Sequence, residues 1–277
     1  MIYKEMSCLA IHDISGVGKC SLTVALPVLS CCGVETSVMP TAVLSTHTGG
    51  LPMAEHCRKV GARFQSLYSG FLGSAGQIGL VEQVFDWFKG EDTLIMVDPV
   101  MGDGGKLYRT YTQEMADGMA RLCQKADIVV PNMTEACHLL GRPYNPGPYT
   151  REEIRGILRQ LCALGPKMAV LTGVWLNEGS LGTACYDART GEAELYLTDR
   201  IEGFYHGTGD LFASALLGGL LNGGSLTGSC EIATEFTWRT IETTFEKSAD
   251  YRFGPKFECH LPWLAEKMEA CRKTVAN

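Results

Sequence analysis

Apolar and polar positions follow two alternating patterns along the first two thirds of the chain. Short runs rich in Val, Ile and Leu, with the lengths of buried strands, lie between longer segments whose apolar residues recur at helical spacing. The short runs predict strands at residues 6–11, 34–39, 93–97, 127–130 and 167–172. The longer segments predict helices at residues 17–32, 77–89, 111–125 and 151–163. Strands that alternate with helices are typical of a parallel sheet covered by helices on both faces.

The pattern changes after residue 182. Two short runs, residues 183–186 and 194–197, flank the turn-forming segment 187–191 (DARTG), and this arrangement predicts an antiparallel hairpin. Helical spacing then predicts long helices at residues 210–221, 231–247 and 261–273. No repeat, charge block or low-complexity linker interrupts the chain, so we expect one α/β domain over residues 1–277. On such a sheet the chemistry is expected in the loops at the carboxyl ends of the strands.

Composition and charge exclude several classes of protein. The chain has 277 residues, a formal net charge of −7 and a pI near 5.4, and it lacks the basic footprint of a nucleic-acid-binding protein. No stretch reaches about 18 apolar residues, so we expect no transmembrane helix, and the N-terminus predicts no signal peptide. The 12 cysteines form no CxxC pair. This favours reduced thiols in a cytoplasmic protein over a disulfide or zinc framework.

A glycine-rich segment near the N-terminus looks like a phosphate-binding loop but fails its requirements. Residues 16–21 (GVGKCS) are similar to the end of a P-loop. That motif needs Gly five residues before its Gly-Lys and Ser or Thr directly after it, whereas the chain has Asp13 and Cys20 there. Residues 73–79 (GSAGQIG) likewise miss the spacing of a dinucleotide-binding GxGxxG motif. We therefore expect neither a P-loop nor a Rossmann cofactor site.

The GTGD motif at residues 207–210 is the most informative one, because it directly precedes an apolar helix. Its glycines allow close backbone approach to a ligand, and the first N–H groups of the helix, with its dipole, form an anion site. An acidic protein could bind phosphate in this way. A carboxylate in such a turn makes chemical sense if Asp210 accepts a proton from a hydroxyl that attacks the phosphate. Helix capping by Asp210 is the alternative, and the local motif alone leaves both open.

Four motifs together resemble one enzyme family. The GTGD turn is similar to that of the ribokinase-like kinases. Residues 98–103 (DPVMGD) resemble a segment of the vitamin kinases in that superfamily, and residues 131–135 (PNMTE) resemble their PNxxE segment. Residues 45–49 (STHTG) look like the SNHTG stretch of pyridoxal kinases. The four motifs occur in the order of the family, so the chain resembles the pyridoxal kinases of the ribokinase-like superfamily.

This resemblance implies a fold, a reaction and a set of site residues. The fold would be a ribokinase-like three-layer sandwich, and the reaction an ATP-dependent phosphorylation of the 5′-hydroxymethyl group of pyridoxal, pyridoxine or pyridoxamine. Asp210 would be the catalytic base, and the anion hole for the γ-phosphate would consist of Gly207, Thr208 and Gly209. The residues expected near Mg²⁺ and the triphosphate are Asp98, Asp103 and Glu135. Further nucleotide contacts are expected from Asn132, Thr172 and Gly173.

The vitamin side rests on three further residues. Thr48 matches a threonine that contacts the pyridine ring, and Phe71 falls where the family often places an aromatic that packs on it. Asp13 stands where many pyridoxal kinases have a serine that contacts the ring, an exchange that bears on the preferred vitamer. Three structural alternatives stay open at this point. They are a core role for Phe71, an exposed helix face for Glu135 and a loop cap for Asp98.

The resemblance leaves two rival functions. Hydroxymethylpyrimidine kinases share the DPVMGD and GTGD motifs, although the STHTG segment favours the pyridoxal branch. The second rival is a non-catalytic vitamin- or nucleotide-binding protein on the same fold, and the intact Asp210 argues against it. Because members of the family are commonly dimers, we expect a homodimer. The resemblance also leaves a monovalent cation open as a further cofactor.

Overall fold

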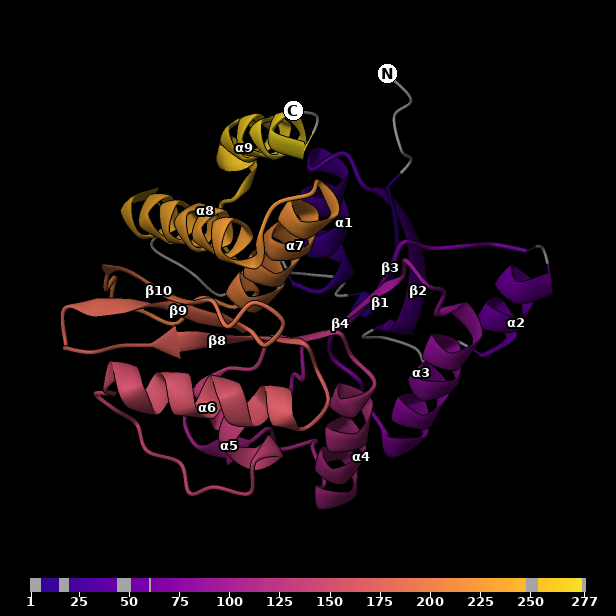
Figure 1. Cartoon of the computed structure of the whole chain (residues 1–277), viewed down its shortest axis with the longest axis horizontal. Coiled ribbons are helices and arrows are strands. Elements are labelled where there is room, and N and C mark those ends of the chain that lie inside the picture. The colour runs from indigo at the N-terminus through magenta and orange to yellow at the C-terminus, as the bar shows by residue number, and fades with distance from the viewer. Residues whose placement is uncertain (1–5, 15–19, 44–50, 60, 248–253, 276–277) are drawn as a thin grey trace.

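An eight-stranded sheet runs through the middle of the molecule in the order β10-β9-β8-β7-β4-β3-β1-β2 (Figure 1). The computed structural model describes residues 6–14, 20–43, 51–59, 61–247 and 254–275. Within this sheet β2, β1, β3, β4, β7 and β8 pair in parallel, and β9 and β10 extend it with antiparallel pairing. The carboxyl ends of the parallel strands therefore meet along one edge of the sheet.

The strands of this sheet are short, and most are buried. Their bounds are β1 Ser7–Ile14, β2 Glu35–Val43, β3 Ser66–Ser69, β4 Leu94–Val97, β7 Ile128–Val129, β8 Met168–Val174, β9 Ser180–Asp187 and β10 Ala193–Asp199. A separate two-stranded hairpin consists of β5 Gly102–Asp103 and β6 Lys106–Leu107. Within β1, Cys8 faces one core while Leu9 and Ile11 face the other. A strand with a core on each side needs apolar residues at successive positions, which explains the continuous apolar runs.

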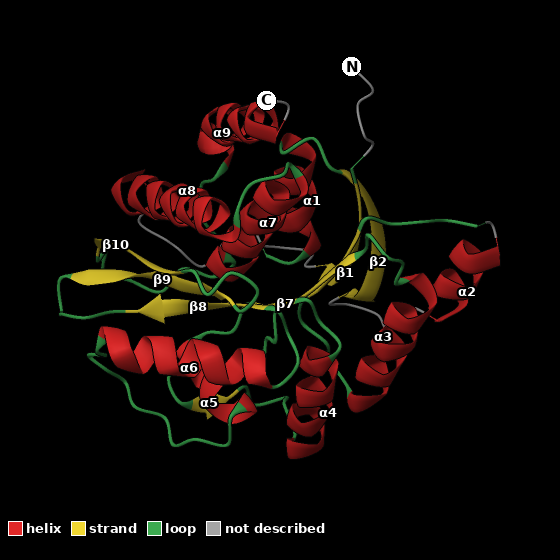
Figure 2. Cartoon of the chain, viewed as in Figure 1, coloured by secondary structure: helices red, strands yellow, loops and turns green. Residues whose placement is uncertain are grey.

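Helices cover both faces of the sheet, as Figure 2 shows. One face carries α1 Leu22–Cys31, α7 Thr208–Leu221, α8 Leu226–Lys247 and α9 Leu261–Val275, with the short 3₁₀ helix Glu258–His260 before α9. The other carries α2 Leu51–Lys59, α3 Ala75–Phe88, α4 Gln113–Gln124, α5 Met133–Leu139 and α6 Arg151–Ala163. Among the described residues, no helix combines the length and apolar character needed to cross a bilayer. All twelve cysteines are free thiols.

The predicted α/β fold is confirmed, including the antiparallel hairpin now seen as β9 and β10. The sequence pattern missed β3, whose segment SLYS is half polar although both of its serines are fully buried. It also missed α2, α5 and the small β5–β6 hairpin. The predicted helix start at residue 17 is wrong for the described part of that range. The helix begins at Leu22, because Ser21 has φ +54° and cannot lie in a right-handed helix.

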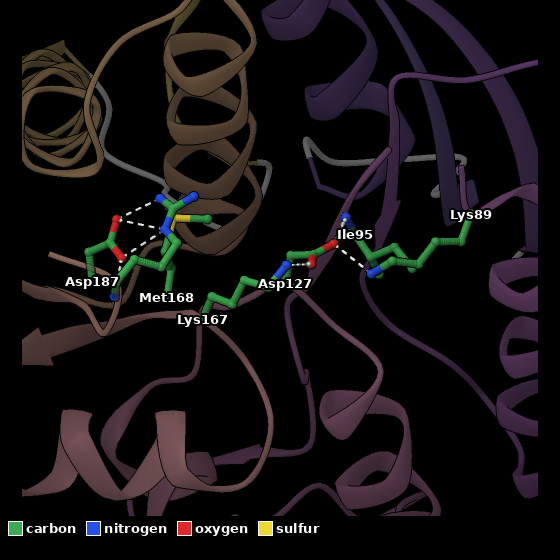
Figure 3. Close-up of polar contacts among 7 residues, drawn as sticks. Lys89, Ile95, Asp127, Lys167, Met168 and Asp187 are labelled. Atoms are coloured by element: carbon green, nitrogen blue, oxygen red, sulfur yellow. Dashed lines mark hydrogen bonds and ion pairs between the residues drawn. The ribbon is translucent and has the colours of Figure 1, made fainter. Parts of the chain in front are cut away.

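Asp127 joins three elements at the amino ends of the central strands (Figure 3). Its carboxylate accepts hydrogen bonds from the Lys89 Nζ at 2.9 Å, the Lys167 Nζ at 3.3 Å and the Ile95 N–H at 3.0 Å. Burial would raise the pKa of Asp127, but these donors outweigh it and lower the pKa below 3.8. The ionised carboxylate of Asp127 therefore stabilises the folded state at pH values above the usual pKa of aspartate.

Replacing Asp127 by Ala is expected to lower the free energy of unfolding by about 2 kcal/mol, because the buried Ile95 N–H loses its acceptor. Asp127→Asn is the matched control, since it keeps an acceptor for that N–H and loses only partly exposed ion pairs worth at most about 1 kcal/mol. Urea unfolding at pH 7 and at pH 3 measures the free energy of unfolding of both variants. The difference between wild type and Asp127→Ala should shrink as the pH falls through the lowered pKa of Asp127. An equal loss in the two variants contradicts this account.

Candidate active site

A cavity of about 430 Å³ opens at the carboxyl edge of the sheet. It lies where β4, β7 and β8 end and where α7 begins. Most of the site residues predicted from the sequence line it, namely Asp98, Asp103, Asn132, Glu135, Thr172, Gly173, Gly207, Thr208, Gly209 and Asp210. Its volume falls in the range of small-molecule binding sites. The structure thus brings motifs from the middle and the end of the chain to one cavity.

The GTGD turn forms the amino end of α7 in a glycine-dependent conformation. Gly207 precedes the helix with φ +84°, a left-handed value that disfavours other residues. The first intrahelical hydrogen bond runs from the Leu211 N–H to the Gly207 carbonyl at 3.1 Å. The N–H groups of Thr208, Gly209 and Asp210 therefore lack intrahelical acceptors, as at any helix start. Because all of these residues line the cavity, the turn can bind an anion there.

Through its carboxylate, Asp210 contacts two residues, Ser21 and His12, that lie far from it in the sequence. Its side chain is 14% exposed, and its Oδ2 accepts a hydrogen bond from the Ser21 N–H of a distant segment at 2.9 Å. The ring Nδ1 of the fully buried His12 lies 3.8 Å from Asp210 Oδ1. Burial raises the pKa of Asp210 to about 6, with a further contribution from Asp13 and an opposing one from the Ser21 N–H. Such a carboxylate is ionised at neutral pH and can accept a proton.

Asp98 and Glu135 add two buried carboxylates to the same cavity. Asp98 follows β4 and is 7% exposed, and Glu135 lies in α5 at 3% exposure. Burial, followed by the charges of Glu135 and Asp210, raises the pKa of Asp98 well above its usual range. Burial likewise raises the pKa of Glu135 to about 8, although backbone N–H donors oppose the shift. Within the described residues, no lysine or arginine pairs with either carboxylate.

The PNMTE segment forms a capping box that fixes Glu135. The Asn132 side chain accepts from the Glu135 N–H at 3.0 Å, and Glu135 Oε2 accepts from the Asn132 N–H at 2.8 Å. Glu135 Oε1 accepts the Met101 N–H at 3.0 Å, and Asn132 Nδ2 donates to the Gly102 carbonyl at 2.9 Å. These bonds join α5 to the DPVMGD segment. The alternative of an exposed helix face for Glu135 is wrong.

The carboxylates provide oxygen donors for a hard cation, but not a closed metal cage. No three His, Cys, Asp or Glu side chains in the described part of the chain are placed to ligate one metal ion directly. Asp103 is exposed at the cavity wall, where its Oδ1 accepts from the Gly104 N–H at 2.7 Å. Uncompensated buried carboxylates beside an anion-binding turn fit a cation that keeps several waters, as Mg²⁺ does.

Asp13 and Phe71, two of the residues predicted to bind the vitamin, do not line this cavity. Asp13 is the penultimate residue of β1 and is 4% exposed, and it accepts a hydrogen bond from the Ser21 hydroxyl at 2.5 Å. Phe71 follows β3, is half-buried, and its carbonyl accepts from the Thr41 hydroxyl at 3.4 Å. Thr48 lies outside the described residues. Ser21 connects Asp13 to Asp210, because its hydroxyl donates to Asp13 and its N–H donates to Asp210 Oδ2.

Sequence reasoning missed one half of the cavity. Its residues come from β9, β10, α8 and the loops around them, and they include the apolar or aromatic Ile201, Trp238 and Ile241. On α8 they occur at positions 234, 237, 238 and 241, a helical spacing that equally fits an ordinary core-facing stripe. No motif in the sequence separates the two cases.

The fold and the site define a kinase of the ribokinase-like class, and comparisons with known proteins agree. A family model described as phosphomethylpyrimidine kinase matches residues 59–254. The chain belongs to this family, and it is a phosphotransferase.

Several relatives cover most of the chain. The pyridoxine/pyridoxal/pyridoxamine kinase of Bordetella avium (strain 197N) is 27% identical over 252 residues, which cover 82% of this chain and 81% of that protein. The pyridoxal kinase structure from Lactobacillus plantarum has a TM-score of 0.84 at 30% identity, covering 96% and 98% of the two chains. A "putative phosphomethylpyrimidine kinase" from Bacteroides thetaiotaomicron, in a crystal form with pyridoxal, has a TM-score of 0.88 at 35% identity, covering 94% and 96%. The resemblance inferred from the motifs is confirmed.

Proposed function

We propose that the protein, acting as one kinase domain, transfers the γ-phosphoryl group of ATP to the 5′-hydroxymethyl group of pyridoxal, pyridoxine or pyridoxamine. The observation that carries this proposal is the meeting of the GTGD turn, the base Asp210 and two buried carboxylates in one cavity. The names of the relatives from Bordetella avium and Lactobacillus plantarum support the substrate class. An intact base beside an anion site argues against a protein that only binds a vitamin or a nucleotide.

The geometry supports a direct transfer. Because Asp210 Oδ2 accepts the Ser21 N–H, we assign Oδ1 as the oxygen that takes the hydroxyl proton. The substrate oxygen then forms its bond to the γ-phosphorus while the bond from that phosphorus to the β,γ-bridging oxygen breaks, and ADP leaves. The N–H groups of Thr208, Gly209 and Asp210 stabilise the charge that develops on the transferring group. Thr172 and Gly173 contact the nucleotide, and its base occupies the part of the cavity near Trp238.

Mg²⁺ is part of this proposal. Asp98, Glu135 and Asp103 would hold it together with water and the triphosphate, and when bound it would neutralise charge on the phosphates. The Asn132 and Met101 N–H groups hold the carboxylate of Glu135 in place at the cavity wall. The support is the set of buried oxygen donors, Asp98 and Glu135, whose pKa values are raised mainly by burial.

A second candidate substrate is hydroxymethylpyrimidine. The family model carries the phosphomethylpyrimidine kinase description. In addition, a hydroxymethylpyrimidine/phosphomethylpyrimidine kinase of Streptomyces coelicolor (strain ATCC BAA-471 / A3(2) / M145) is 30% identical over 186 residues, or 65% of this chain and 64% of that protein. Both substrates present a hydroxymethyl group on a flat heterocycle, so the same base and anion site serve either one.

Initial rates with Mg·ATP against the three B6 vitamers and hydroxymethylpyrimidine, side by side, test the substrate. We expect kcat/KM to be at least about tenfold higher for one or more B6 vitamers, a difference of about 1.4 kcal/mol in transition-state binding. ADP release and the phosphorylated product are measured together, so that ATP hydrolysis is not counted. Turnover of hydroxymethylpyrimidine alone would contradict the B6 assignment and favour the second candidate substrate. Parallel assays with K⁺ and with a tetraalkylammonium salt show whether a monovalent cation is required.

The proposal includes a homodimer in the cytoplasm. Its structural support is the terminal position of β2 in the sheet, together with two partly exposed apolar residues, Leu26 of α1 at 40% and Val38 of β2 at 38%. Twelve free cysteines suit a reducing compartment. Light scattering of the purified protein measures the mass of the assembly directly.

A further inference from the structure

Ser21 has a backbone conformation that serine rarely adopts. Its φ of +54° and ψ of −133° are typical of glycine at the first central position of a type II′ turn. Among the described residues it is the one non-glycine residue with positive φ, and it is 7% exposed. Such a conformation persists only where surrounding contacts hold it, and it occurs preferentially at functional sites.

Two carboxylates accept hydrogen bonds from Ser21. Its hydroxyl donates to Asp13 Oδ1 at 2.5 Å, and its N–H donates to Asp210 Oδ2 at 2.9 Å. The second bond joins residues 189 positions apart and links the start of α1 to the start of α7. Donors placed between two buried acids compensate part of the charge on each.

The hydroxyl of Ser21 is not used for its own helix. Although Ser21 occupies the N-cap position of α1, its side chain makes no capping hydrogen bond. At this turn the Thr23 hydroxyl accepts from the Cys20 N–H at 3.2 Å and donates to the Cys20 carbonyl at 2.7 Å. A role in helix stability therefore does not explain why Ser21 is strained and why its hydroxyl turns to Asp13.

We propose that Ser21 is a positioning residue for the base: the bond from its hydroxyl to Asp13 holds the strained backbone that aims the Ser21 N–H at Asp210. This inference rests on the proposed role of Asp210. It gives Asp13 a task besides any contact with the vitamin, because Asp13 anchors the residue that orients the base. The two tasks differ in their kinetic signature, since orientation of the base acts on kcat and vitamin contact acts on KM.

The pair Ser21→Ala and Ser21→Gly tests the proposal. Both variants lose the hydroxyl and keep the N–H, but only glycine adopts a φ near +54° without steric cost. In Ser21→Ala the backbone is expected to relax and to withdraw the N–H, so kcat falls about 10- to 100-fold, the loss expected for one hydrogen bond to a charged group. In Ser21→Gly kcat falls about threefold, and KM for both substrates stays within about threefold in either variant.

Thr23→Ala is the matched control, because it removes a hydroxyl from the same turn without touching either acid. We expect its kcat to stay within about twofold of wild type. Equal kcat losses in Ser21→Ala and Ser21→Gly overturn the proposal, as does a change confined to KM. If the wild-type enzyme phosphorylates no B6 vitamer or pyrimidine, the proposed function fails and this inference fails with it. Wild-type turnover with equal losses overturns this inference alone.

A second comparison does not require that Ser21→Ala folds. Asp13→Ala is made in the wild type and in the Ser21→Gly background. If Asp13 acts through the Ser21 hydroxyl, its removal lowers kcat at least about tenfold in the wild type but at most about threefold where that hydroxyl is already absent. The same factor in both backgrounds shows that Asp13 and Ser21 act independently and overturns the proposal.

Discussion

Replacing Asp210 by Asn is expected to lower kcat by about 10²- to 10⁴-fold, the usual contribution of a positioned general base. Asparagine has nearly the same shape and still accepts the Ser21 N–H, but it cannot take a proton from the substrate hydroxyl. Binding of ATP should change little, because the Gly207, Thr208 and Gly209 backbone remains in place. Single-turnover kinetics and calorimetric titration with a non-hydrolysable ATP analogue separate the two effects. A kcat within tenfold of wild type would rule out Asp210 as the base.

The same substitution should stabilise the protein. Burial raises the pKa of Asp210 from 3.8 to about 6, so the ionised form at neutral pH costs the folded state up to about 3 kcal/mol. Because the folded-state pKa is raised, this cost is complete above about pH 6 and disappears below the unfolded value. Asp210→Asn should therefore gain stability at pH 7 and little at pH 3.5, whereas wild-type kcat/KM declines below about pH 6. Asp117→Asn, at an exposed position of α4, is the control for the loss of a charge.

Glu135 is expected to give the second large effect, on stability and on activity together. Glu135→Ala leaves the buried Met101 N–H and the partly buried Asn132 N–H without their acceptor, which lowers the free energy of unfolding by about 2–4 kcal/mol. It also removes one of the carboxylates proposed to bind Mg²⁺. We expect kcat/KM for ATP to fall at least about 100-fold. Urea unfolding and initial rates over a range of Mg²⁺ concentrations measure the two losses.

Glu135→Gln separates the two roles of this residue. Glutamine keeps the volume and one acceptor oxygen, so most of the stability should remain, while the ionisable group proposed to bind the cation is gone. The variant should need a higher Mg²⁺ concentration for half-maximal rate than wild type. An unchanged Mg²⁺ dependence in a well-folded Glu135→Gln protein would show that Glu135 has only its capping role.

The sequence predicted those parts of the site whose residues lie together in short local motifs. The GTGD turn fixes a helix start, because Gly207 adopts φ +84° and the following residues form an apolar helix. Asn132 and Glu135 lie three residues apart, the spacing of a capping box, and the structure forms that box. Motifs of this kind act over a few residues, so their geometry follows from the local sequence. Their meeting in one cavity followed from the expected parallel sheet, whose strands end at the same edge.

Other parts of the site depend on contacts between distant segments. Ser21 reads as an ordinary residue at the start of a helix, and only the approach of Asp13 and Asp210 shows why its backbone is strained. The raised pKa values of Asp98 and Glu135 likewise arise from burial and from each other, not from neighbours in sequence. Short strands such as β3 were missed for the same reason. β3 lies inside the sheet between β1 and β4, with helices on both faces, and Ser66 and Ser69 are fully buried there.

The sequence by itself determined the alternation of strands and helices, the turn that is proposed to bind phosphate and the family to which the motifs point. These features rest on hydrophobic periodicity and on backbone preferences, which are local. Only the tertiary structure decided which oxygen of each carboxylate accepts a hydrogen bond, how deeply the acids are buried and which apolar residues complete the cavity. Those properties depend on which segments become neighbours in space, and desolvation and hydrogen bonding act on a residue only once these neighbours are in place.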